Sequence, residues 1–215
     1  MEKWNSYTGE MILEPIIDEN GNVPDEPSLE DQFKHAIYSS SNGELSLVKL
    51  YHTDGFGWYF YNNKIVFVLH ECKANIKAKT ARGFITCLKK AFLQNIGYYF
   101  KIKHGKIKRG FPKKLVELSK GYDSIHQFII DNFGLFLMTN EVFVSHIVID
   151  DKVQELLDAL EPLILETDKS PSNYWDDPRL REVMESFDVL DYPFERMDKD
   201  VDIADTGKIL NNILK

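Results

Sequence analysis

The chain has 215 residues, of which 43% are apolar, and a formal net charge of −8. This is enough for one good-sized core, or a core with a small appendage. No run reaches the roughly 18 apolar residues that a membrane span requires. The first residues lack a signal peptide's apolar segment, and two cysteines, Cys72 and Cys87, are too few for a disulfide framework or a zinc site of their own. We therefore expect a cytoplasmic protein with reduced cysteines and no membrane partner.

The first part of the chain predicts one helix and then a meander of strands. Ser28 is a good N-cap, and the apolar stripe after it predicts a helix from 28 to about 39. Asn62-Asn63 fits a tight hairpin turn between two strands. The strands are expected at 45–51, 57–61 and 64–72. The last of these is apolar on both faces, which is typical of a central strand covered by helices.

The second part predicts mostly helices, with one further strand pair. A basic connector over 101–114 follows a long helix at 79–99, and an acidic loop is expected at 167–177. Other helices are expected at 115–120, 124–132, 151–165 and 178–187, and strands at 134–138 and 142–149 around a turn at Thr139-Asn140. This order indicates an α/β fold with a mixed sheet. We expect a core over 1–150 and an acidic helical extension or connector over 151–215.

The charges are segregated along the chain. No Asp or Glu occurs between Cys72 and Val116, and that stretch holds 13 of the 26 basic residues, which leaves 13 positive against 34 negative charges elsewhere. Such segregation favours one basic surface for a polyanion on an otherwise acidic body. The alternative is a solvated face with no ligand.

A carboxylate and an ammonium group end the apolar strand at 64–72. Glu71 and Lys73 are two residues apart, so they share a face of that strand. Burying both charges is costly unless they meet each other, a metal or a substrate. Asp54 lies 17 positions before Glu71, across the predicted hairpin. Asp and Glu are the ligands Mg²⁺ prefers, and a Lys can orient water and neutralise a phosphate, so this set predicts a metal-dependent phosphodiesterase.

Asp54 followed by Glu71-Cys72-Lys73 resembles the PD-(D/E)xK nuclease superfamily, although Thr53 stands where the family often has Pro. The stretch Gln94-Asn95-Ile96-Gly97-Tyr98 resembles the Q-x-x-x-Y motif of one branch of that superfamily. Gln94 and Tyr98, at i and i+4, would share one face of the long helix. The alternative for these two residues is a polar Gln near a helix end and a core Tyr.

The resemblance implies a restriction-endonuclease-like α/β/α core with a central mixed sheet. It also implies hydrolysis of DNA to 5′-phosphate ends with Mg²⁺, for which Mn²⁺ could substitute. The catalytic residues would be Asp54, Glu71, Lys73 and Gln94. The metal would be held by Asp54, Glu71 and the backbone carbonyl of Cys72. Glu30, on the first helix, is a further candidate ligand, and the alternative is a first-turn acid that complements the helix dipole.

The expected partner is DNA, and cationic side chains would bind the DNA backbone without sequence preference. The DNA-binding residues would be Tyr98, Lys101, Lys103, Lys106, Lys108 and Arg109. The layout is similar to the N-terminal nuclease domains of restriction–modification enzymes, which implies methyltransferase or motor domains or subunits as further partners. Two alternatives stay open: a repair or phage exonuclease or junction nuclease of the same superfamily, and a non-catalytic nuclease-like module that only binds DNA.

Overall fold

The structure, a computed structural model, describes residues 45–48, 53–61, 64–73, 81–111, 113–140 and 143–196. The predicted helix at 28–39 and the candidate ligand Glu30 lie outside these residues. Within these ranges, no helix combines the length and apolarity needed to cross a bilayer.

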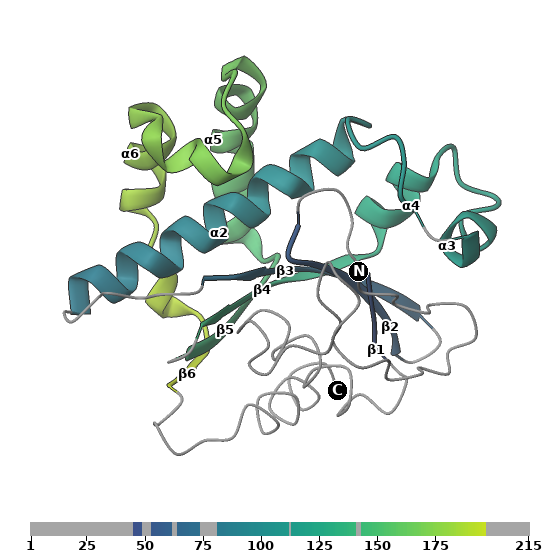
Figure 1. Ribbon diagram of the computed structural model, residues 1–215, viewed down its shortest axis with the longest axis horizontal. Coiled ribbons are helices and arrows are strands. Elements are labelled where there is room, and N and C mark those ends of the chain that lie inside the picture. The colour runs from purple at the N-terminus through teal and green to yellow at the C-terminus, as the bar shows by residue number, and fades with distance from the viewer. Residues whose placement is uncertain are drawn as a thin grey trace, which may run out of the picture.

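The described strands form one mixed sheet of six (Figure 1). They are β1 (Leu45–Val48), β2 (Gly55–Tyr61), β3 (Lys64–Cys72), β4 (Phe133–Asn140), β5 (Phe143–Val148) and β6 (Phe194–Arg196). Their spatial order follows the chain from β1 to β6. Neighbouring strands in this sheet are antiparallel except β3 and β4, which are parallel. The predicted α/β fold with a mixed sheet is therefore confirmed.

The helices of the described part are α2 (Ala81–Lys103), α3 (Lys113–Leu118), α4 (Ile125–Asp131), α5 (Asp151–Glu166) and α6 (Pro178–Ser186), with 3-10 turns η1 (Pro171–Asp176) and η2 (Val189–Asp191). Side-chain oxygens cap three of these helices: Ser124 begins α4, Asp150 begins α5, and Asp177 begins α6. Each accepts a hydrogen bond from a backbone N–H that the helix itself leaves unpaired.

The central strand β3 has the bounds that its apolar run predicts. Its Phe67 and Leu69 are fully buried. In the pairing of β4 with β5, Asn140 lies opposite Phe143. Thr139 and Asn140 are therefore strand residues. Our prediction of a turn at Thr139-Asn140 was wrong, because β4 extends two residues further than its most apolar segment.

Helix α2 lies in the connection between the parallel strands β3 and β4, and other elements pack on it from more than one side. It packs on the sheet, and η1, α5 and α6 contact it as well (Figure 1). All residues from 91 to 100 are buried. Gly97 permits the close contact with η1, because a Cβ atom at that position would lie 2.5 Å from a ring carbon of Tyr174.

The residues after 150 do not form a separate extension in the described part of the chain. A single cluster of buried side chains runs from Phe56 to Tyr192, and β6 adds a strand to the edge of the sheet beside β5. Residues 151–196 thus contribute to the same core and sheet as the elements before them, and the division at 150 stays a prediction.

Candidate active site

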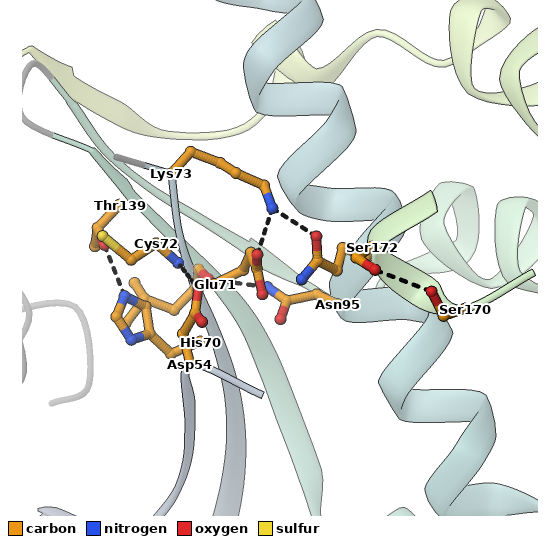
Figure 2. A network of polar contacts seen from close by, with 11 residues as sticks. Asp54, His70, Glu71, Cys72, Lys73, Asn95, Thr139, Ser170 and Ser172 are labelled. Atoms are coloured by element: carbon orange, nitrogen blue, oxygen red, sulfur yellow. Dashed lines mark hydrogen bonds and ion pairs between the residues drawn. The ribbon is translucent and has the colours of Figure 1, made fainter. Parts of the chain in front are cut away.

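Lys73 joins the end of β3 to the middle of α2. Its ammonium nitrogen Nζ donates hydrogen bonds to Glu71 Oε1 and to Gln94 Oε1, each at 2.5 Å (Figure 2). Glu71 is 1% exposed and Gln94 is 7% exposed, whereas the Lys73 side chain is 27% exposed. The structure thus brings together three of the four predicted catalytic residues on the face of β3 that α2 covers, with only the lysine reaching solvent.

Asp54, the fourth, lies just before β2 and closes the same strand end. Its Oδ2 accepts a hydrogen bond of 2.7 Å from the backbone N–H of Cys72 (Figure 2). In an extended strand the N–H and C=O of one residue point to the same side. The Cys72 carbonyl therefore points to the side of β3 on which Asp54 lies.

The protonation of Glu71 is strongly shifted. Burial raises the pKa of Glu71 to about 8 from an ordinary value of 4.5, because the charged form loses its hydration. The charge of Lys73 opposes this rise, and the neighbouring Asp54 carboxyl adds to it by repulsion and by a hydrogen bond to the protonated acid. Two carboxyl groups that share so small a space are stable together only with a proton or a cation between them.

The residues present fit a divalent cation such as Mg²⁺. The second oxygen of Glu71, Oε2, is buried and finds no hydrogen-bond donor, while the Asp54 carboxyl lies within hydrogen-bonding reach of Glu71. These oxygens and the Cys72 carbonyl are hard ligands of the kind Mg²⁺ prefers. Among the described residues, no group of three or more His, Cys, Asp or Glu side chains with metal-binding geometry occurs.

The opposite face of β3 is structural. His70 is fully buried, and its Nε2 lies 2.7 Å from the Thr139 hydroxyl on β4. Gly55 on β2 leaves room for this ring, since a Cβ atom there would lie 3.2 Å from His70. His70 therefore packs inside the sheet as a buried residue in contact with Thr139.

Asn95 is a site neighbour that our interpretation of the sequence passed over. It is fully buried next to Gln94, and its Nδ2 donates a 2.9 Å hydrogen bond to the Leu137 carbonyl of β4. This bond ties α2 to the strand beside β3, next to the point where Gln94 meets Lys73 (Figure 2). The signal in the sequence was a polar residue inside an otherwise apolar helical stretch.

Tyr98, the other residue of the predicted motif, lies one turn after Gln94 on α2. Tyr98 is 2% exposed and belongs to the core cluster. This burial favours the alternative of a core Tyr, and the contact of Tyr98 with DNA stays a prediction.

The five predicted cationic contacts lie beyond the middle of α2. Lys103 is nine residues after Gln94, about 14 Å along the helix axis. Its Nζ donates to Glu161 Oε2 on α5 at 2.8 Å, and Lys101 is half-buried. Lys106, Lys108 and Arg109 are exposed in the connector after α2. Of these five cations, Lys103 is thus exposed but paired with Glu161, while Lys106, Lys108 and Arg109 present exposed side chains.

No protein-family model, curated protein or solved structure matches the chain.

Proposed function

We propose that the protein is a Mg²⁺-dependent deoxyribonuclease of the PD-(D/E)xK type, acting in the cytoplasm as the nuclease part of a restriction–modification system. Its products would carry 5′-phosphate ends. The observation that carries this proposal is the Lys73 ammonium group, held between the buried Glu71 and Gln94 beside the Asp54 carboxyl.

The two carboxyl groups supply the negative side of the proposed site. Asp54, Glu71 and the Cys72 carbonyl would hold the ion. Bound there, Mg²⁺ would polarise the phosphate and stabilise charge on the attacking and leaving oxygens. The hydrogen bond from the Cys72 N–H fixes one oxygen of Asp54, which leaves the carboxylate oriented before any ligand arrives.

Lys73 supplies the positive side. Its ammonium group has three N–H donors, of which Glu71 and Gln94 take two. The ammonium group would orient the attacking water or a phosphate oxygen, and its charge would offset that of the transition state. Gln94 acts here as a positioning residue, because its amide oxygen fixes the direction of the lysine side chain.

The test is cleavage of supercoiled and linear DNA with Mg²⁺, with and without a chelator. We expect the wild-type chain to nick or linearise the plasmid, and we expect Lys73→Met to lose roughly 10²- to 10⁴-fold in rate. Lys120→Met removes one exposed lysine at the end of α3 and serves as the matched control. DNA ligase should reseal the product ends, since ligation requires a 5′ phosphate.

Equal cleavage by wild type, Lys73→Met and Glu71→Gln would refute the assignment of the site. Cleavage that persists in the chelator would refute the role of the metal.

A further inference from the structure

A groove of about 650 Å³ lies beside the first half of α2. Its walls come from α2, η1 and α6, and it is lined by Ile85, Thr86, Lys89, Trp175, Arg181 and Glu185. None of the proposed catalytic residues lines it. The indole of Trp175 is half-buried, with part of its surface packed on the core and part facing the groove.

Cations surround this indole from two walls. Lys90 Nζ lies 5.7 Å from the centre of the Trp175 ring, and Arg181 on α6 is exposed. Lys89 donates a 2.8 Å hydrogen bond to the backbone carbonyl of Glu185, which fixes its head group at the rim. The Glu185 carboxylate is the single acid among the lining residues, so the positive charge is in excess.

An aromatic face ringed by cations is the chemistry that binds unpaired nucleic acid. A base stacks on the ring, and its phosphates pair with Lys and Arg whatever the sequence. A helical or extended protein segment would instead favour an apolar groove. The apolar lining here is limited to Ile85 and the indole, and two of the lining residues are cations.

The groove is close to the proposed cleavage site along the same helix. Lys89 and Lys90 precede Gln94 by four to five residues, about 6 to 8 Å of helix rise. That distance corresponds to about two nucleotides along one strand of B-DNA. Along the axis of α2, the groove is therefore offset from the Lys73–Gln94 contact by only a few nucleotides' length.

We propose that this groove binds an unpaired nucleotide of the DNA strand that flanks the cleaved phosphate, with its base against Trp175 and its phosphates on Lys89 and Arg181. This inference rests on the proposed nuclease function. It implies that the substrate is DNA with a single-stranded or frayed segment next to the cut.

Binding without cleavage separates the two claims. The full-length chain is titrated, in chelator, into a short fluorescein-labelled single-stranded oligonucleotide and into the blunt duplex of the same sequence, and anisotropy reports the affinity. We expect Trp175→Ala to weaken single-strand binding by roughly 5- to 150-fold and to change duplex binding far less. Arg181→Gln should lower the slope of log affinity against log salt by about 0.7. Lys120→Gln, at an exposed position just after α3, is the charge-matched control.

Trp175→Phe keeps an aromatic ring and guards against a folding defect, so it should retain most of the affinity. Unchanged single-strand binding in Trp175→Ala and Arg181→Gln would overturn the inference and leave the groove to a protein partner or to another segment of this chain. An equal loss for single strand and duplex would overturn it too. Retained groove-dependent binding in a chain that cleaves no DNA with Mg²⁺ would refute the proposed nuclease function instead.

Discussion

Replacing Glu71 by Gln should make the protein more stable in alkaline solution, although it removes a group proposed to be essential. In the metal-free protein the buried Glu71 carboxyl has a pKa of about 8 against an ordinary 4.5. The folded state therefore binds a proton more tightly than the unfolded state, and the stability that this proton supplies is complete below pH 4.5. It is lost as the pH rises through 8.

The size of the effect follows from the two pKa values. The interval from 4.5 to about 8, at 1.36 kcal/mol per pH unit, gives a loss on the order of 5 kcal/mol by pH 9. Roughly 3 kcal/mol of this is already lost at pH 7. A Gln at this position has no charge to bury, can accept from Lys73, and can donate its amide to the Asp54 carboxylate. It avoids the loss altogether.

The assay is urea unfolding of both proteins from pH 5 to pH 9 in chelator, followed by tryptophan fluorescence, for which Trp58 is a buried probe. The free energy of unfolding of Glu71→Gln minus that of wild type should be near zero at pH 5 and rise steadily to several kcal/mol at pH 9. Glu155→Gln, at an exposed position on α5, should show no such trend. A difference that stays constant with pH, or that falls, would refute the account of Glu71 as a buried acid in a crowded carboxyl pair.

Three further predictions address the packing around the site. Gly97→Ala should lower the free energy of unfolding by about 1 to 3 kcal/mol in urea titrations, because its Cβ would lie 2.5 Å from the Tyr174 ring. An unchanged urea midpoint would contradict this and show that η1 moves away freely. Tyr192→Phe should lower the free energy of unfolding by about 1 to 3 kcal/mol, since its hydroxyl donates to the Asp150 carboxylate that caps α5, at 2.8 and 2.9 Å. The exposed Tyr122→Phe is the control, and an equal loss of stability in both variants would contradict the reasoning. Asn95→Leu removes the hydrogen bond between α2 and the Leu137 carbonyl, so Gln94 and Lys73 should shift. The cleavage rate should fall while the KM for DNA changes little, and kinetics in which only KM rises would contradict a positioning role.

The sequence could predict the parts of the fold that depend on neighbouring residues. The apolar run 64–72 has the bounds of β3, because a strand covered on both faces needs apolar residues throughout. The alternation of the strand also placed Glu71 and Lys73 on one face, with His70 on the other. The resemblance named Gln94 as a site residue, and Gln94 contacts Lys73 because the helix after a central strand packs back against it.

What could not be predicted depends on contacts between distant segments. Gln94 and Tyr98 share a helix face in isolation, but η1 and the helices after residue 150 cover α2 and bury Tyr98. The spacing of the motif residues gives no indication that other elements pack over this face of α2. In the same way, the acid-free stretch is continuous in sequence, but its cations lie toward both ends of α2 and do not gather at one place along the helix. The groove at Trp175 combines residues almost a hundred positions apart, so no local pattern indicated it.

The hydrogen bond from the Cys72 amide to the Asp54 carboxylate has a practical consequence. A charged acceptor moves the resonance of an amide proton downfield and slows its exchange with solvent, and this amide is paired with a carboxylate where the neighbouring strand would offer a carbonyl. In a ¹⁵N-labelled sample, its cross-peak would be a built-in sensor for whatever binds Asp54. Titrating divalent ions while following that one peak would measure their occupancy of the strand end with no nucleic acid in the tube.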